Sequence, residues 1–173
     1  MEPYIELSRL VNLERLYKKN LVYSLKATPS EAAALAQRFG IVSVNELQAE
    51  YTVEGGRTIM KGYYVVGQLQ AQVVQSCVTT LKQVTEDVEC RFSFHAIDQK
   101  YQDESFNDQE DDDREFSVED VVDLGEITAQ YLSLSLNPYP RASEDLKEET
   151  DTSEGPLPSE KINPFAVLKS LKP

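Results

Sequence analysis

Three long segments of alternating apolar and polar residues constrain the fold of this chain more than any other feature. They span Leu47–Val53, Thr58–Val74 and Thr80–Phe94. A period of two residues is typical of a strand that buries one face. The Glu54–Arg57 segment contains two adjacent glycines, which supply the positive φ of a hairpin turn. The sequence therefore predicts an α+β fold: a twisted antiparallel β-meander or partly closed barrel, with a few packed helices and acidic flexible loops.

Interruptions and shorter segments refine this picture. Gly62 and Gly67 interrupt the middle alternating segment, where we expect bulges or a bend. Tyr4–Val11 alternates loosely and predicts a short strand with Ile5, Leu7 and Val11 facing inward. Leu21–Ala27 alternates as well and predicts one more strand.

Helix signals are clearest between Thr28 and Gly40. Thr28 is a good N-cap, Pro29 suits the first helical position, and Glu31 can complete a capping box. Good helix formers continue to Phe39, and Gly40 is a typical C-terminal stop. We expect this helix to pack on the sheet, because it is too short to be stable alone.

A second helix is predicted to begin after Asp123. Asp123 can accept a hydrogen bond from the third residue of the helix, where Glu126 can reach back to complete a capping box. Pro138 ends the helix. Its apolar residues recur at helical spacing: Leu124, Ile127, Tyr131 and Leu134, widened by Leu132 and Leu136.

The net charge of −13 lies in the second half of the chain. Residues 1–97 hold ten Lys and Arg against ten Asp and Glu, whereas residues 98–173 hold seven against twenty. An acidic half attracts basic proteins and repels phosphate backbones. Any direct RNA contact is therefore expected on the neutral first half.

The acidic segments also suggest where the folded domain ends. We expect a single α+β domain over residues 1–141, with an acidic mobile loop at 98–119. Residues 142–160 are predicted to be an acidic flexible linker, and residues 161–173 a short C-terminal amphipathic helix. Phe165 and Leu168 belong to the apolar stripe of that helix.

Targeting and redox signals are few. No apolar stretch approaches the length of a transmembrane helix, and the acidic N-terminus lacks the apolar segment of a secretory signal. The two cysteines cannot form a disulfide scaffold. We therefore expect a reduced, cytoplasmic protein that does not bind membranes.

Enzymatic motifs are missing from the sequence. There is no nucleophile elbow, Walker loop, dinucleotide fingerprint or zinc-protease motif, and the single histidine is His95. Cys77, Cys90 and His95 offer three zinc ligands in principle, but structural thiols are the favoured interpretation. We expect a non-enzymatic protein with no metal, cofactor or small-molecule substrate.

A calcium site in the acidic loop is an alternative interpretation of its carboxylates. Asp108, Glu110, Asp112 and Glu119 fall at positions one, three, five and twelve of a loop, but Asp113 stands where an EF-hand needs glycine. A solvated acidic loop is the favoured interpretation.

Three segments together resemble the YceD family of large ribosomal RNA subunit accumulation proteins. They are Gln75–Leu81, the Asp123–Glu126 segment leading into Leu134–Pro140, and Asn163–Leu168. Many members of that family carry Cys-x-x-Cys-Leu in the first segment, whereas this chain has Thr80 at the second cysteine. The resemblance implies a cytoplasmic protein that supports accumulation of 23S ribosomal RNA and assembly of the large ribosomal subunit, with no catalytic residues.

Two modes of action are open at this point. In the first, the protein binds a basic large-subunit ribosomal protein, or pre-ribosomal RNA with protein, through its acidic half and C-terminal helix. The candidate residues for this partner are Asp111, Asp112, Asp113, Phe165 and Leu168. In the second, a neutral sheet face binds a 23S ribosomal RNA precursor directly, because cations can meet phosphates and aromatic rings can stack on bases. The candidates for RNA contact are Arg57, Lys61, Tyr63, Lys82 and Arg91, with Tyr64 beside them.

Overall fold

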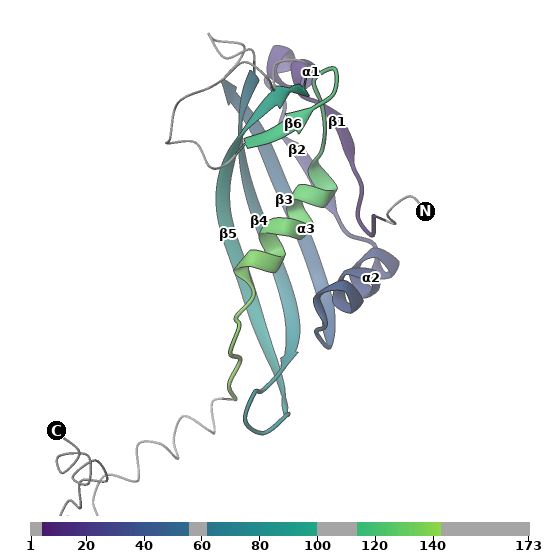
Figure 1. Ribbon diagram of the computed structural model, residues 1–173, viewed down its shortest axis with the longest axis vertical. Coiled ribbons are helices and arrows are strands. Elements are labelled where there is room, and N and C mark those ends of the chain that lie inside the picture. Colours follow the sequence, from purple (N-terminus) through teal and green to yellow (C-terminus); the bar gives the residue numbers. More distant parts are fainter. Residues whose placement is uncertain (1–4, 56–61, 100–113, 143–173) are drawn as a thin grey trace, which may run out of the picture. The chain divides into compact units, whose positions relative to one another are not determined.

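The structure is a computed structural model that describes residues 5–55, 62–99 and 114–142 (Figure 1). All of these residues belong to one compact unit that spans residues 1–142. The described elements, in chain order, are β1 (Leu10–Asn12), α1 (Leu13–Lys19), β2 (Tyr23–Lys26), α2 (Pro29–Phe39), β3 (Ser43–Gly55), β4 (Gly62–Ser76), β5 (Gln83–Asp98), β6 (Arg114–Ser117), β7 (Val121–Asp123) and α3 (Leu124–Ser135).

The main sheet has the strand order β2-β3-β4-β5-β6. The first four strands pair antiparallel, so the predicted α+β meander is confirmed. Strand β6 pairs parallel with the end of β5, and β1 forms a separate two-stranded sheet with β7. Within the described residues no pairing joins β2 to β6, so the sheet stays open and does not close into a barrel.

Of the bulges or bend predicted at Gly62 and Gly67, no bulge forms. Strands β4 and β5 pair without a register shift, and the two irregularities of the sheet lie in β3. Gly67 is instead required by packing. A Cβ atom there would lie 2.5 Å from the ring of Phe92 and 3.0 Å from the ring of Tyr51. The glycine therefore makes room for two aromatic side chains on the buried face.

The N-terminal strand is shorter than predicted. Only residues 10–12 of this region pair as a strand, and Ile5 is 43% exposed, not inward-facing. Leu7 is fully buried. Residues 7–9 instead run past the first turn of α3, where the Leu124 N–H donates to the Arg9 carbonyl at 3.0 Å.

Part of the expected acidic loop is a strand. Residues 114–117 form β6, in register with the end of β5 from His95 to Asp98. Ser117 and Asp98 are buried there. The charge count of residues 98–119 did not indicate this strand, because the strand depends on pairing with β5, which lies earlier in the chain. Residues 114–117 are therefore strand and not loop.

Helix α2 forms as its sequence signals indicate. The Thr28 hydroxyl accepts from the Glu31 N–H at 3.4 Å, and the Thr28 N–H donates to Glu31 Oε2 at 2.8 Å. Gly40 follows the helix with φ of 66°. This capping box and glycine stop are confirmed.

Helix α3 forms with a different cap and a shifted apolar stripe. Asp123 Oδ1 accepts from the N–H groups of Gly125 and Glu126, at 3.0 and 3.2 Å. Glu126 does not complete a capping box, because Arg38 binds both of its oxygens, at 2.7 and 2.9 Å. Leu134, expected in the buried stripe, is 81% exposed, whereas Leu132 is fully buried.

Aromatic side chains join α3 to the inner face of the sheet. The rings of Phe92 and Tyr131 stack with centroids 3.8 Å apart, and Tyr51 contacts Phe92 edge-on at 5.8 Å. Tyr51 is fully buried, and its hydroxyl lies 2.6 Å from Thr128 Oγ1 and donates to the Leu124 carbonyl at 3.1 Å. Burial raises the pKa of Tyr51, so the phenol stays neutral.

Candidate functional site

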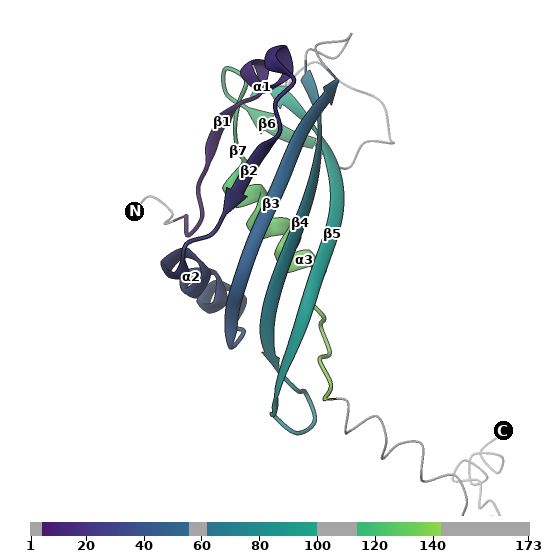
Figure 2. The ribbon, with the colours of Figure 1, turned by 180° about the vertical axis from the view of Figure 1, so that it is seen from behind.

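The face of the main sheet that points away from α3 carries no helix among the described residues. Figure 2 shows β3, β4 and β5 running across the front of the molecule with α3 behind them. Alternation along β4 places its apolar residues inward and its polar residues on this side. We call this side the outer face, and its polar residues come from β2, β3, β4 and β5.

Amide side chains form two hydrogen-bonded rows across the outer face. In one, Gln48 donates to Gln70 at 2.8 Å, and Gln70 donates to Glu89 at 3.0 Å. In the other, Asn45 donates to Gln72 at 3.2 Å, and Gln72 donates to Asp87 at 3.0 Å. Each row ends on a carboxylate of β5. The rows fix the side chains of three strands in one layer and leave the carboxylates at its margin.

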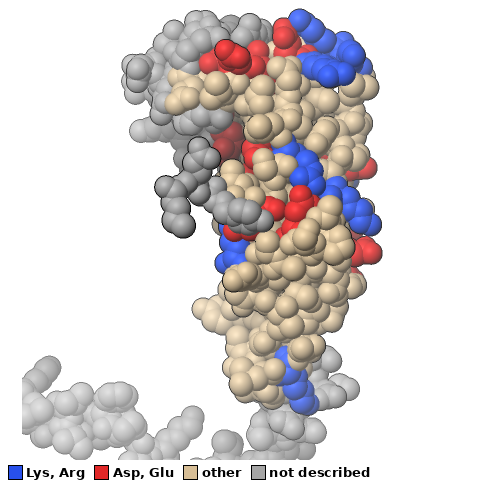
Figure 3. Space-filling view, turned by 90° about the vertical axis from the view of Figure 1, so that its right-hand side faces the viewer, with Lys and Arg blue, Asp and Glu red and all other residues tan. Residues whose placement is uncertain are grey.

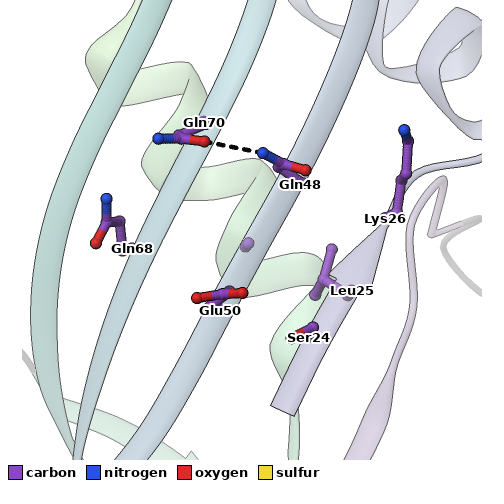
Figure 4. Close-up of a pocket in the computed structure, with 8 residues that line it drawn as sticks. Ser24, Leu25, Lys26, Gln48, Glu50, Gln68 and Gln70 are labelled. Atoms are coloured by element: carbon purple, nitrogen blue, oxygen red, sulfur yellow. Dashed lines mark hydrogen bonds between the residues drawn. The ribbon is translucent and has the colours of Figure 1, made fainter. Parts of the chain in front are cut away.

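Shallow hollows lie along this layer. One of about 330 Å³ is lined by residues of β2, β3 and β4, among them Lys26, Glu50 and Gln68. Figure 4 shows these side chains projecting from the three strands, with the bond between Gln48 and Gln70 drawn at its rim. Neighbouring hollows of about 260 and 220 Å³ continue across β4 to β5. The outer face can therefore receive side chains of a partner.

The outer face is acidic although the first half of the chain is neutral. The carboxylates that line its hollows are Glu46, Glu50, Asp87 and Glu89. The cations that line them are Lys26 and Arg91. Other cations of the first half lie elsewhere. Arg38 forms an ion pair with Glu126 of the second half, and Lys19 and Lys82 are exposed away from the hollows. This distribution leaves an excess of negative charge on the one uncovered sheet surface that the structure describes.

Ion pairs hold the helices in place. Arg9 binds both oxygens of Glu31 at 2.8 and 3.0 Å, and this hydrogen-bonded pairing lowers the pKa of Glu31 to about 2. Arg38 bridges Glu126 and Glu6, and its hydrogen bonds lower the pKa of Glu126. Figure 3 shows this mixture of blue and red over the middle of the molecule. These charges are therefore structural.

Two of the segments that carry the family resemblance meet at the far end of the β4–β5 hairpin. The Val78 N–H donates to the Pro140 carbonyl at 2.9 Å, and Gln75 Nε2 donates to the Asn137 carbonyl at 3.0 Å. Pro140 and Cys77 are buried at this junction. The extended segment after α3 is thus fixed against the hairpin, an arrangement that sequence spacing does not reveal.

Among the described residues predicted for RNA contact, Tyr63, Lys82 and Arg91 do not share one surface. Tyr63 is 3% exposed and its ring packs 6.0 Å from that of Tyr17, so stacking of Tyr63 on a base is incompatible with its burial. Arg91 lies on the outer face and donates to Gln68 at 3.3 Å. Lys82 is exposed beside the hairpin end, away from Arg91 along β5.

Other predicted site residues lie outside the described part of the chain. They are Arg57, Lys61, Asp111, Asp112, Asp113, Phe165 and Leu168. The same holds for three of the four calcium-loop candidates, Asp108, Glu110 and Asp112. Tyr64, named beside the RNA candidates, is half-buried with its ring 5.0 Å from that of His95.

The three possible zinc ligands lie far apart. Cys90 pairs with Leu69, and His95 pairs with Tyr64, whereas Cys77 follows the end of β4. The eight positions from Leu69 to Cys77 correspond to about 26 Å at roughly 3.3 Å per residue. The Cys77 sulfur instead accepts from the Thr80 N–H at 3.5 Å. The described residues contain no cluster of three or more His, Cys, Asp or Glu able to hold a metal ion.

Sequence reasoning missed the amide rows and the junction at the hairpin end. The alternation of Gln68, Gln70 and Gln72 was a usable signal for the rows, because residues two apart share a strand face. The junction with Pro140 had no such signal, because it depends on the path of the chain after α3.

Comparison with known proteins gives one match. The family model described as "Large ribosomal RNA subunit accumulation protein YceD" matches residues 65–172, which is more than half of the chain. No curated protein and no solved structure matches. The matched family is named for RNA accumulation and not for an enzymatic reaction. Among the helices of the described residues, none is both long and apolar enough to cross a membrane.

Proposed function

Because this chain belongs to the YceD family of large ribosomal RNA subunit accumulation proteins, we propose that it supports large-subunit RNA accumulation as a non-enzymatic binding factor. Its partner is a basic large-subunit ribosomal protein, which the outer face holds during assembly. We propose that it acts in the cytoplasm, the location that the sequence predicts.

The observation that carries this proposal is the pair of amide rows ending on Glu89 and Asp87. Lysine and arginine side chains can donate to those carboxylates, and strong hydrogen bonds form where one partner is charged. The amides are already ordered by their neighbours, so binding costs little further side-chain entropy. The hollows beside Glu46 and Glu50 offer space for long basic side chains.

Electrostatics favours a basic protein over RNA at this surface. Four carboxylates against two cations line the hollows, which repels a phosphate backbone and attracts positive charge. Complementary charge mainly raises the association rate and selects the partner. The residues that the sequence predicts as partner-binding, Asp111, Asp112 and Asp113 with Phe165 and Leu168, would add to the same attraction.

Equilibrium binding to purified basic large-subunit ribosomal proteins tests this proposal. The full-length chain is titrated at low and high ionic strength, beside a variant with Glu50→Gln and Glu89→Gln. Both changes keep the side-chain shape and an acceptor oxygen, so the amide rows can persist. We expect affinity to fall about fivefold, since exposed charge pairs are worth roughly 0.2–1 kcal/mol each.

A matched control removes the same charge elsewhere. Glu14→Gln with Glu119→Gln changes two carboxylates of α1 and of the turn after β6, so the net charge equals that of the outer-face variant. This control should bind as the unmodified protein does. If both variants weaken binding equally, only net charge matters and the outer face is not the binding site.

A further inference from the structure

The end of the β4–β5 hairpin exposes apolar side chains that the fold does not need. Val78 is 49% exposed, Leu81 78% and Tyr139 74%. We call this end, with Lys82 and Arg141, the hairpin tip.

Backbone hydrogen bonds hold the hairpin tip in one shape. The Leu81 N–H donates to the Cys77 carbonyl at 2.9 Å, and the Cys77 N–H donates to the Lys82 carbonyl at 2.7 Å. The Val78 N–H donates to the Pro140 carbonyl at 2.9 Å, which fixes the residues on either side of that proline next to the hairpin. The exposed side chains are therefore presented from an ordered backbone.

Folding stability does not account for the sequence of the hairpin tip. Leu81 has φ of 61°, a conformation that suits glycine or asparagine far better than a leucine. The buried Oε1 atom of Gln75, at the base of the tip, has no hydrogen-bond partner within the described residues. An exposed leucine in a strained turn and an unsatisfied buried acceptor are both unfavourable. Such departures from local rules concentrate at functional sites.

The charge of the hairpin tip points to an anionic partner. Lys82 and Arg141 are exposed there, in a chain whose net charge is −13. On the face that Figure 3 shows, blue and tan but no red lie at the end of the molecule where the hairpin lies. Glu86 lies further along β5, four residues from Lys82, and accepts from Asn137 at 3.1 Å. A basic ribosomal protein is therefore a poor fit for this end.

An exposed aromatic ring at the same end of the hairpin as two cations and apolar side chains is suited to single-stranded nucleic acid. Bases stack on aromatic rings, and lysine and arginine bind the phosphates on either side. Aliphatic side chains such as Leu81 and Val78 can contact the faces of unstacked bases. We propose that the hairpin tip binds a single-stranded segment of RNA, with Tyr139 stacked on a base and Lys82 and Arg141 on its phosphates.

This RNA site lies on a different surface from the outer face and goes beyond the proposed function. An RNA-binding tip and a protein-binding outer face would let one chain bring a basic ribosomal protein to RNA. Either surface can be disabled by substitution while the other still binds, so their tests are independent.

Tryptophan fluorescence tests the stacking directly, because the chain contains no tryptophan. The full-length Tyr139→Trp variant carries one reporter at the hairpin tip, and Leu10→Trp carries a control reporter at a position 73% exposed in β1. We expect a single-stranded uridine oligonucleotide to quench the reporter at position 139 and to leave the reporter at position 10 unchanged. Equal quenching of both, or none, would overturn the proposal.

Affinity measurements on the same oligonucleotide provide the second readout. Tyr139→Ala should weaken binding about tenfold, the order expected when one base no longer stacks, whereas Tyr139→Phe should retain it. Lys82→Ala with Arg141→Ala should make the logarithm of affinity fall less steeply with the logarithm of salt concentration, by about 0.7 for each phosphate that is no longer bound. Circular dichroism confirms that each variant is folded. Unchanged RNA affinity in folded Tyr139→Ala would refute the proposed stacking, as would a fluorescence response to a basic ribosomal protein alone.

Discussion

Replacing Gly125 with alanine sets helix propensity against close packing in the first turn of α3. An added Cβ atom would lie 2.7 Å from the Leu7 carbonyl oxygen and 2.9 Å from the Arg9 nitrogen. These are backbone atoms, so neither can turn aside as a side chain would. The Arg9 N–H also donates to Asp123 at 2.6 Å, and any displacement disturbs that bond.

The expected magnitude follows from opposing contributions to the free energy of unfolding. Alanine gains about 1 kcal/mol of helix propensity over glycine. Overpacking costs about 1–3 kcal/mol, and weakening a hydrogen bond to a charged group costs about 1.5 kcal/mol. We therefore expect Gly125→Ala to destabilise the protein by about 2.5 kcal/mol, in the middle of the range that these contributions allow.

Urea denaturation followed by circular dichroism measures this change. The midpoint should fall without a change in slope, because the surface exposed on unfolding is nearly constant. Ser133→Ala is the matched control, since Ser133 is exposed in the same helix and should gain a few tenths of a kcal/mol. A Gly125→Ala variant as stable as the parent, or more so, would show that α3 does not contact residues 7–9 as described.

Further outcomes follow from the core, the ion pairs and the predicted partner-binding segment. Tyr51→Phe should lower the free energy of unfolding by about 1–2 kcal/mol, because it removes the hydroxyl that bonds buried groups of α3, and urea denaturation measures it. Arg9 lowers the pKa of Glu31 from 4.5 to about 2, so the pair stabilises the fold at neutral pH and this contribution disappears as pH falls through that interval. The free energy of unfolding of Glu31→Gln, measured against pH, should therefore decline less than that of the unmodified protein between pH 4.5 and about 2. Replacing Phe165 and Leu168 with alanine separates two outcomes: a lower unfolding midpoint if the C-terminal helix packs on this chain, and an unchanged midpoint with weaker binding to large-subunit components if it packs on the partner. Elemental analysis of untagged protein should find no stoichiometric zinc, and one zinc per chain would contradict this.

Local signals predicted the elements whose reasons are local. The capping box at Thr28 and the glycine stop at Gly40 depend on neighbouring residues, and both form as expected. The antiparallel meander was also predictable, because period-two alternation determines which strand face is buried.

Predictions failed where the deciding interaction involves residues far away in the sequence. Glu126 has the right position for a capping box, but Arg38, 88 residues away, binds it instead. Strand β6 forms because β5 offers an unpaired edge, which charge composition cannot indicate. The sequence alone presents Gly67 as a break in the strand. The reason for the glycine is its contact with the rings of Phe92 and Tyr51, which lie far away in the sequence.

The candidate site was predictable only in its chemistry. The charge counts predicted an acidic surface and led to the basic partner that we propose for it. The charge counts placed the excess of carboxylates in the second half of the chain. The described acidic surface, however, belongs to strands of the first half. The difference arises because first-half cations such as Lys19 and Lys82 lie away from the outer face, and Arg38 pairs with Glu126 of the second half.

The level of large-subunit ribosomal RNA in cells tests the central claim most directly. Cells lacking this chain are complemented either with the Glu50→Gln, Glu89→Gln variant or with the Glu14→Gln, Glu119→Gln control, at equal protein levels. The ratio of large-subunit to small-subunit ribosomal RNA is then measured. We expect the control to restore the ratio and the outer-face variant to restore it only in part. Full restoration by the outer-face variant, together with unchanged binding to basic ribosomal proteins, would contradict the proposed role of the outer face.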